Sequence, residues 1–381
     1  MSTAVALKSR AGRWIVLAAV LGSGMALLDG TVVNVAVKPI GEDLRADLAE
    51  LQWVVNAYML SLASLILIGG SLGDRFGRRR VFLVGVGWFA AASLVCGLAQ
   101  DPLQLVAARA LQGVGGALLT PGSLAILQAS LERADRARGI GVWSAYTGIA
   151  AALGPLLGGW LIQVASWRWV FFINVPLAVV VLVVTARHVP ESGHRVPGQR
   201  FDVAGAALGA LGLAGVTFAL IEAGESGGTV VLVAGGAGAA CLAAFVLRER
   251  RTPEPMLPPS LFADRTFSVV NLETFVVYGA LGGMLFLLVL QLQVSAGFTP
   301  LTAGLSMAPF TVIMLLFSSR SGALAARIGP RAQLVGGPVV AALGVLLLSR
   351  VGAGAGYVGD VLPGICLFGA GMTLLVAPLT S

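Results

Sequence analysis

Long apolar runs separated by short polar segments extend along the whole chain. A helix needs about 20 apolar residues to cross the hydrocarbon core of a bilayer, and only a helix satisfies its own backbone hydrogen bonds there. The runs that reach this length are 14–37, 52–72, 81–99, 103–128, 139–163, 170–186, 202–221, 229–247, 269–291, 301–319, 332–349 and 359–379. This pattern predicts an all-α polytopic membrane protein with about 12 spans.

The basic residues occupy alternate polar segments. With the N-terminus inside, the inner segments hold 20 of the 25 Lys and Arg residues, the outer segments hold four, and Arg109 lies within a span. Cytoplasmic loops carry such an excess of Lys and Arg, so we expect both ends of this chain to be cytoplasmic. The abundance of Arg over Lys, together with 51 Gly, favours a GC-rich bacterial gene. The expected location is therefore the cytoplasmic (inner) membrane of a bacterium.

The composition agrees with a membrane protein and excludes several other classes. Hydrophobic residues make up 57% of the chain and charged residues 11%, against about 25% charged in soluble domains. The net charge of +7 is spread over short loops, which indicates membrane orientation and no nucleic-acid partner. The cysteines, Cys96, Cys241 and Cys366, each lie in an apolar run without metal-ligand spacing, so we expect packing residues and no metal.

A glycine- and arginine-rich turn at 70–80 has an echo at 322–331, where the acid Asp74 is replaced by Ala326. A second pair of echoes links Gly113 and Gly115 to Gly369 and Gly371 at nearly the same offset. Internal repeats of this kind are typical of transporters.

Eight spans separate the two copies of the turn, whereas two simple six-span halves would give six. We therefore predict a six-helix bundle at 1–188, two inserted linker spans at 189–252, and a C-terminal bundle at 253–381 with four of six spans. The chain ends directly after a span, and we expect a fragment that lacks the last two spans.

Two opposite charges lie at similar depth within spans. Arg109 is about seven residues, or ~10 Å, from the outer end of its span, and Asp29 is ~12 Å from the outer end of the first span. Intramembrane ionisable residues are costly and are functional by default. Gln112 lies on the same helical face as Arg109. A proton on Asp29 would weaken the charge environment of Arg109; the alternative is a static structural ion pair, and direct contact stays open.

Five motifs occur in order at matching topological places: 28–36, 70–80, 105–115, 154–159 with Gly141 upstream, and 167–176. With them the chain resembles the major facilitator superfamily, and specifically its fourteen-span drug–proton antiporters. Ala150 stands where the resembled motif has glycine, and Lys38 where it usually has proline.

The resemblance implies a major facilitator fold of two six-helix halves with two inserted linker helices, here with an incomplete C-terminal half. It implies proton-coupled export of amphipathic or cationic drugs by alternating access. The implied partners are a small-molecule substrate, H+ and the lipid bilayer, for a monomer that needs no cofactor. One alternative is a dedicated exporter of a single metabolite, such as an antibiotic. Another is a truncated membrane protein that does not transport.

The resemblance also assigns expected roles. Asp29 and Arg109 would couple protons, and Asn34, Gln112 and Glu273 are speculative substrate or proton residues. Glu273 is equally explained as an interfacial acid at a helix N-terminus. The gating loop would comprise Gly70, Gly73, Asp74, Arg75, Gly77, Arg78 and Arg79. The antiporter helix motif would comprise Gly141, Gly154, Pro155, Gly158 and Gly159.

The sequence lacks the motifs expected of an enzyme or of an ATP-driven pump. No nucleotide-binding loop of the Gly-x-x-x-x-Gly-Lys-Ser/Thr type occurs. No catalytic triad can be assembled from the sequence either. The chain is therefore predicted not to be an enzyme.

Overall fold

The structure is a computed structural model that describes residues 4–192, 202–223, 228–252, 255 and 257–379. Within these residues all the regular secondary-structure elements are helices. The sole β-type pairing among them is an isolated bridge between Val5 and Leu131. Twelve stretches of the described chain are helical, long and apolar enough to cross a membrane. The predicted all-α class and the count of about 12 spans are confirmed.

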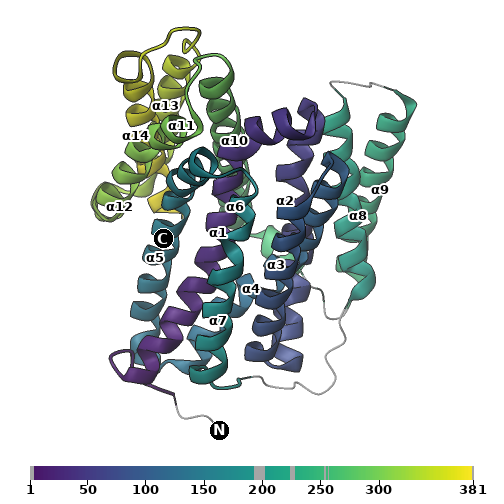
Figure 1. Cartoon of the computed structure of the whole chain (residues 1–381). Coiled ribbons are helices and arrows are strands. Elements are labelled where there is room, and N and C mark those ends of the chain that lie inside the picture. Colours follow the sequence, from purple (N-terminus) through teal and green to yellow (C-terminus); the bar gives the residue numbers. More distant parts are fainter. Residues whose placement is uncertain (1–3, 193–201, 224–227, 253–254, 256, 380–381) are drawn as a thin grey trace. The chain divides into compact units, whose positions relative to one another are not determined.

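The helices follow one another along the chain as Figure 1 shows. They are α1 (Arg10–Leu44), α2 (Leu48–Phe76), α3 (Arg78–Leu98), α4 (Pro102–Ser130), α5 (Arg133–Val164), α6 (Trp169–Phe172), α7 (Asn174–His188), α8 (Val203–Glu222), α9 (Thr229–Arg251), η1 (Pro259–Ala263), α10 (Arg265–Val294), α11 (Pro300–Ser306), α12 (Ala308–Ile328), α13 (Pro330–Leu348), η2 (Tyr357–Val361) and α14 (Leu362–Leu379).

Several helices extend well beyond the apolar runs that predict them. The second span was predicted to begin at residue 52, but α2 begins at Leu48. Asp47 Oδ1 accepts a hydrogen bond from the Glu50 N–H, and Glu50 Oε2 accepts one from the Asp47 N–H, at 2.8 and 3.0 Å. This capping box satisfies two backbone donors at the helix start. The apolar run marks the part of a helix suited to hydrocarbon, whereas polar capping residues mark where the helix begins.

The sixth span is broken at Ile173, between α6 and α7. Pro176 lacks the N–H that would bond to the Phe172 carbonyl, which weakens the helix at this point. The Phe171 carbonyl accepts a hydrogen bond from Ser93 Oγ at 2.9 Å. A side chain from α3 therefore satisfies a carbonyl at the break.

The chain forms two compact units. Unit 1 comprises Met1–Gly30, Pro39–Ala151 and Trp167–Pro259, and unit 2 comprises Thr31–Lys38, Ala152–Ser166 and Ser260–Ser381. Helices α1 and α5 contribute segments to both units. The predicted division of the chain at residues 188 and 252 stays a prediction.

The two sequence repeats adopt the same local packing, one in each unit. In unit 1, α4 packs against both α2 and α3, and in unit 2, α14 packs against both α12 and α13. A Cβ atom added at Gly115 on α4 would lie 2.7 Å from the Phe89 nitrogen on α3, and one at Gly371 on α14 would lie 2.3 Å from the Ala341 nitrogen on α13. Corresponding glycines thus permit the close approach of corresponding helices.

The turns of the two repeats also match. Gly77 joins α2 to α3 with φ +106°, and Gly329 joins α12 to α13 with φ +84°. Residues with a side chain rarely adopt such angles, whereas glycine does so at little cost. The internal repeat seen in the sequence is therefore present in the backbone.

The linker helices α8 and α9 pack on each other, and α8 packs on α2 within unit 1 (Figure 1). Trp53 Nε1 on α2 donates to Glu222 Oε1 on α8 at 3.2 Å, and the Trp53 ring lies 6.1 Å from the Phe218 ring. At the other end of the pair, Asp202 and Arg248 form an ion pair at 2.8 Å. Polar contacts thus hold α8 to α2 at one end and to α9 at the other.

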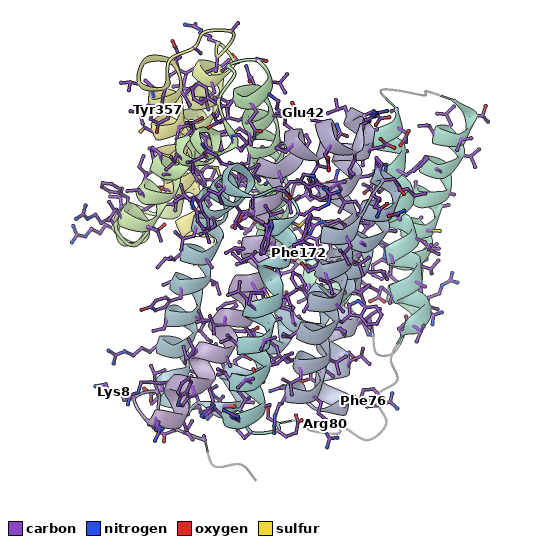
Figure 2. The ribbon with its side chains drawn as sticks, in the orientation of Figure 1. Lys8, Glu42, Phe76, Arg80, Phe172 and Tyr357 are labelled. Atoms are coloured by element: carbon purple, nitrogen blue, oxygen red, sulfur yellow. The ribbon has the colours of Figure 1, made fainter. Side chains whose placement is uncertain are left out.

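Basic side chains gather at one end of the unit 1 bundle. Lys8, Phe76 and Arg80 lie at this end, and Glu42 lies toward the other (Figure 2). We call the end that carries Lys8 and Arg80 the arginine-rich end.

Candidate functional site

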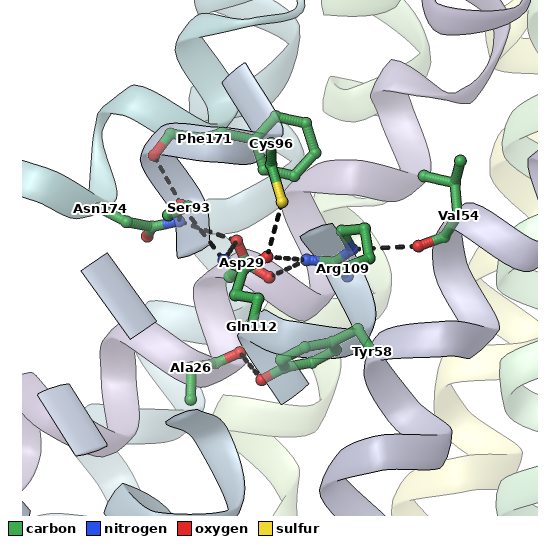
Figure 3. A network of polar contacts seen from close by, with 10 residues as sticks. All are labelled: Ala26, Asp29, Val54, Tyr58, Ser93, Cys96, Arg109, Gln112, Phe171 and Asn174. Atoms are coloured by element: carbon green, nitrogen blue, oxygen red, sulfur yellow. Dashed lines mark hydrogen bonds and ion pairs between the residues drawn. The ribbon is translucent and has the colours of Figure 1, made fainter. Parts of the chain in front are cut away.

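Asp29 and Arg109 form an ion pair inside unit 1. Arg109 Nη1 lies 2.5 Å from Asp29 Oδ2, and the two side chains are 1% and 0% exposed. Asp29 comes from α1 and Arg109 from α4, 80 positions apart in the chain. The contact that the sequence left open is therefore made, and Figure 3 shows it at the centre of a polar network.

Three further polar side chains complete the network, each fully buried. Gln112 on α4 donates through Nε2 to Asp29 Oδ1 at 2.8 Å and accepts from Arg109 Nη1 at 2.7 Å. Asn174, the first residue of α7, donates through Nδ2 to Asp29 Oδ1 at 2.8 Å and to Ser93 Oγ on α3 at 2.9 Å. The carboxylate of Asp29 thus accepts hydrogen bonds from α4 and α7 together (Figure 3).

The guanidinium of Arg109 lies among aromatic rings and one backbone carbonyl. Its Cζ atom is 4.4 Å from the Tyr58 ring centroid and 5.7 Å from that of Phe171. Its Nε donates to the Val54 carbonyl at 3.0 Å. Cation–π contacts of this kind strengthen when water is excluded. Arg109 is therefore stabilised by Asp29, by neutral acceptors and by two aromatic faces.

The buried Arg109 depends on the charge of Asp29 for its stability. A buried pair of opposite charges is tolerated, whereas a single buried charge is costly. With a neutral Asp29, the guanidinium loses its charged partner and keeps neutral acceptors, among them the Val54 carbonyl and Gln112 Oε1. Loss of the Asp29 charge would therefore leave Arg109 as a single buried charge.

Sequence reasoning identified Asp29, Arg109 and Gln112 but missed Ser93, Asn174 and Tyr58. Asn174 stands in the motif 167–176, and that position was the available signal. Ser93 carried no signal, because a single serine in an apolar run is also common as a packing residue. Cys96, expected to be a packing residue, contacts the network through Sγ, 3.6 Å from Gln112 Oε1.

The gating-loop residues lie at the arginine-rich end of α2 and α3. Arg78 Nη2, at the start of α3, lies 2.8 Å from Asp74 Oδ1, in the last turn of α2, and both side chains are partly exposed. A cavity of about 300 Å³ at this place is lined by Gly69, Gly70, Gly73, Asp74, Arg78, Val81, Leu118, Pro121, Gly122, Leu124, Ala125 and Gln128. Arg75 packs over the ring of Phe76, 5.6 Å from its centroid. This turn therefore combines an ion pair with a hollow between α2 and α4.

Glu191, which follows α7, is a partner of this turn that sequence reasoning missed. Its Oε1 accepts from the Arg79 N–H at 3.1 Å, and its Oε2 lies 3.7 Å from Arg80 Nε. Arg79 Nη2 donates to the Ala186 carbonyl at 2.5 Å. A carboxylate at the N-terminus of α3 is favoured by the helix dipole. The turn is thus tied to the end of α7.

The antiporter helix motif packs closely within unit 2, except for one residue. Gly158 on α5 faces Val32, and a Cβ at Gly159 would lie 2.6 Å from the Leu301 Cα. The Pro155 carbonyl packs on Gly304 of α11, and Gly154 is buried. Gly141 belongs to unit 1, is exposed, and has open space around it. The structure thus brings 154–159 into a tight interface and leaves Gly141 outside it.

The two remaining candidates, Asn34 and Glu273, lie in unit 2, and both side chains are half-buried. Asn34 belongs to α1, and Glu273 to α10. Among the residues that the structure describes, no group of three or more His, Cys, Asp or Glu side chains is placed to hold a metal ion.

Comparisons with known proteins agree with one family. The family model of the Major Facilitator Superfamily matches residues 19–381. The chain is 37% identical to the probable actinorhodin transporter of Streptomyces coelicolor and 36% identical to the multidrug resistance protein Stp of Mycobacterium tuberculosis, matched over 97% and 95% of its own residues. The matches cover 66% and 67% of those relatives, so the chain spans about two-thirds of their length.

The fold also matches solved structures. A crystal structure of the peptide transporter POT in complex with sulfate superposes with a TM-score of 0.70 at 15% identity, over 98% of this chain and 82% of that one. At this identity the likeness concerns the fold alone.

Proposed function

Because the chain belongs to the major facilitator superfamily, a family of membrane transporters, we propose that it exports small molecules in exchange for protons. Within the superfamily we place it in the fourteen-span branch of drug–proton antiporters. It works by alternating access, as a monomer and without a cofactor. Both described ends of the chain face the cytoplasm, as the distribution of Lys and Arg favours.

The observation that carries this proposal is the buried ion pair of Asp29 and Arg109. An exchanger needs a site that binds a proton in one step of the cycle and is deprotonated when substrate binds. The protonation of this site must change the relative free energies of the inward-facing and outward-facing conformations. Protonation of Asp29 removes the charge partner of a guanidinium that is 1% exposed. When Asp29 releases its proton, Arg109 regains a charged partner and free energy is released. This free energy couples proton release to the conformational change that returns the transporter to its starting state.

The turn at 70–80 acts as the gate on the cytoplasmic side. Asp74 and Arg78 are partly exposed and paired across the turn between α2 and α3, so exchanging their partners costs little. The adjoining cavity leaves room for side chains to rearrange between α2 and α4. The close packing of Gly158 and Gly159 within unit 2 shapes the conformational change of the antiporter.

The two relatives named above favour different breadths of substrate. One is named for a single compound, actinorhodin, and the other for multidrug resistance. We propose amphipathic, often cationic, toxic compounds as substrates, with Asn34 and Glu273 as candidate contacts in unit 2. The second candidate function, export of one self-made antibiotic, is favoured by the first relative.

The test is accumulation of a fluorescent amphipathic cation in inverted vesicles that contain the protein. Accumulation should require an acid interior and should disappear in Asp29→Asn, while binding of the cation to the detergent-solubilised variant persists. Accumulation by the wild-type protein without a proton gradient would overturn the exchange mechanism.

Asp43→Asn is the matched control. Asp43 lies on the same helix, is 47% exposed and pairs with Arg168, so its loss should leave accumulation intact. A panel of unrelated compounds then separates the two candidate functions. Competition by several of them supports a multidrug exporter, and competition by one alone supports a dedicated exporter.

A further inference from the structure

Asn174 contacts Asp29 directly but has no role in the proposed exchange of protons between Asp29 and water. It is the first residue of α7, directly after the break at Ile173. Its amide nitrogen uses both of its hydrogens, one toward Asp29 Oδ1 at 2.8 Å and one toward Ser93 Oγ at 2.9 Å. Its oxygen, Oδ1, is buried and has no hydrogen-bond partner among the residues that the structure describes.

Among the residues that the structure describes, every side chain that hydrogen-bonds to the Asp29 carboxylate is a donor. Oδ1 accepts from Gln112 and Asn174, and Oδ2 accepts from Arg109. This environment suits an ionised carboxylate, which only accepts hydrogen bonds. A protonated carboxyl must donate its O–H as well, and none of the three atoms that contact the carboxylate in the described chain is an acceptor. Binding of a proton therefore requires at least one of the three donors to rearrange.

Two of the three donors are held in place by other bonds. Arg109 carries a permanent charge and cannot become an acceptor. Gln112 Oε1 accepts from Arg109 Nη1 at 2.7 Å, so turning the Gln112 amide would set its N–H groups against the guanidinium. No such bond holds the Asn174 oxygen. A half-turn of the Asn174 amide places an acceptor where Asp29 needs one.

We propose that Asn174 is a positioning residue whose side-chain amide reverses when Asp29 is protonated, an inference that rests on the proposed proton exchange at Asp29. With an ionised Asp29, Asn174 Nδ2 donates to Oδ1. When a proton arrives from water on Oδ1, the amide turns and Asn174 Oδ1 accepts the new O–H. No covalent bond other than O–H is formed. Ser93 Oγ, which donates to the Phe171 carbonyl, can donate to the same acceptor only by leaving that carbonyl.

The reversal reaches beyond the side chain because of where Asn174 lies. Ser93 Oγ holds the Phe171 carbonyl at the break between α6 and α7. Asn174 Nδ2 donates to that same Ser93 oxygen (Figure 3). Turning the amide therefore changes the hydrogen bonds of Ser93, which in turn holds the Phe171 carbonyl at the break. The start of α7 is thereby coupled to the protonation of Asp29. The other titratable or charged groups around Asp29 are Arg109 on α4, Tyr58 on α2 and Cys96 on α3.

Infrared difference spectroscopy of the intact protein, recorded against pH, tests this reversal. The carboxylic-acid band of Asp29 is assigned by its absence in Asp29→Asn. The amide carbonyl band of Asn174, one of four asparagines, is assigned with isotope-labelled asparagine and by its absence in Asn174→Leu. On acidification the Asn174 band should shift to lower frequency with the same midpoint as the Asp29 band, because its oxygen gains a hydrogen bond.

The two possible failures are distinguishable. If the Asp29 band titrates and the Asn174 band stays in place, Asn174 is a static donor and the reversal is wrong, while proton exchange at Asp29 survives. If Asp29 does not titrate over the pH range in which the protein is folded, the proposed function itself fails.

Asn174→Leu adds a second readout. The lost bond to the ionised carboxylate is about twice as strong as the lost bond to the neutral carboxyl, so the midpoint of the Asp29 band in this variant should differ from that of a control that leaves the network intact. Thr185→Val is the matched control, since Thr185 is a buried polar residue on the same helix outside the network. A midpoint in Asn174→Leu equal to that of Thr185→Val would overturn the assignment.

Discussion

Arg109 Nη1 and Asp29 Oδ2 lie 2.5 Å apart, and neither side chain is more than 1% exposed. Breaking a buried pair by removing one partner costs about 3–5 kcal/mol, because it leaves a single buried charge. We therefore expect Arg109→Gln to lower the free energy of unfolding by about this amount.

The double variant Asp29→Asn/Arg109→Gln should recover most of that loss, because no buried charge is left. Unfolding of the four proteins of this double-mutant cycle in detergent measures the coupling. If the double variant is no more stable than Arg109→Gln alone, the loss of stability in Arg109→Gln does not come from leaving Asp29 as an unpaired buried charge.

The variant Asp74→Asn distinguishes a gating role of Asp74 from a role in stabilising the fold. The Asp74 side chain is 55% exposed, and its partner Arg78 lies across the turn that joins α2 to α3. Exposed ion pairs contribute about 0.2–1 kcal/mol, so the thermal midpoint should hardly change. Proton-driven accumulation of the fluorescent cation should fall severalfold if the pair gates transport. A large drop in the thermal midpoint would assign Asp74 a structural role instead.

The two turn glycines offer a comparison within one protein. Gly77→Ala and Gly329→Ala each place a side chain at a positive φ angle, which costs about 1–2 kcal/mol. At Gly77 a Cβ would also lie 2.7 Å from the Glu191 carboxylate, whereas at Gly329 nothing lies within 4 Å. We expect Gly77→Ala to be the more destabilising variant, as measured by thermal unfolding. Equal losses would mean that Glu191 moves aside freely.

The ion pair of Asp202 and Arg248 should make stability depend on pH in the acid range. Burial of Asp202 raises the pKa of its carboxyl, but hydrogen bonds from the Gly205 N–H and from Arg248 lower it, and the net pKa lies below the ordinary value of 3.8. A carboxyl with a lowered pKa in the folded state stabilises it above the unfolded-state pKa, and this contribution is lost as pH falls through the folded-state pKa.

The difference in thermal midpoint between wild type and Asp202→Asn should therefore stay constant near neutral pH and shrink below about pH 4. Arg248→Gln should reproduce the neutral-pH difference. A difference that persists unchanged in acid would show that the ionised Asp202 does not stabilise the α8–α9 pair.

Much of the fold follows from local patterns in the sequence. The apolar runs determine where a bilayer can be crossed, and Gly77 and Gly329 determine where two tight turns occur. The repeated glycines Gly115 and Gly371 indicate where helices approach closely. Each of these properties depends on a few neighbouring residues, so sequence alone suffices.

The break in the sixth span and the extended helix ends were not predicted. Pro176 stands in that span, but its effect depends on Ser93, which holds the Phe171 carbonyl from another helix. The start of α2 depends on capping by Asp47 and Glu50 rather than on apolar length.

The sequence by itself determined which ionisable residues lie at similar depth in the spans, because depth depends on the count of residues from the end of a helix. Only the tertiary structure decided that Asp29 and Arg109 touch and that Asn174 shares their network. That outcome depends on the rotation of each helix about its axis. Rotation is set by packing, as where Gly113 of α4 lies directly against the Tyr58 carbonyl of α2, and no single stretch of sequence contains both sides of such a contact.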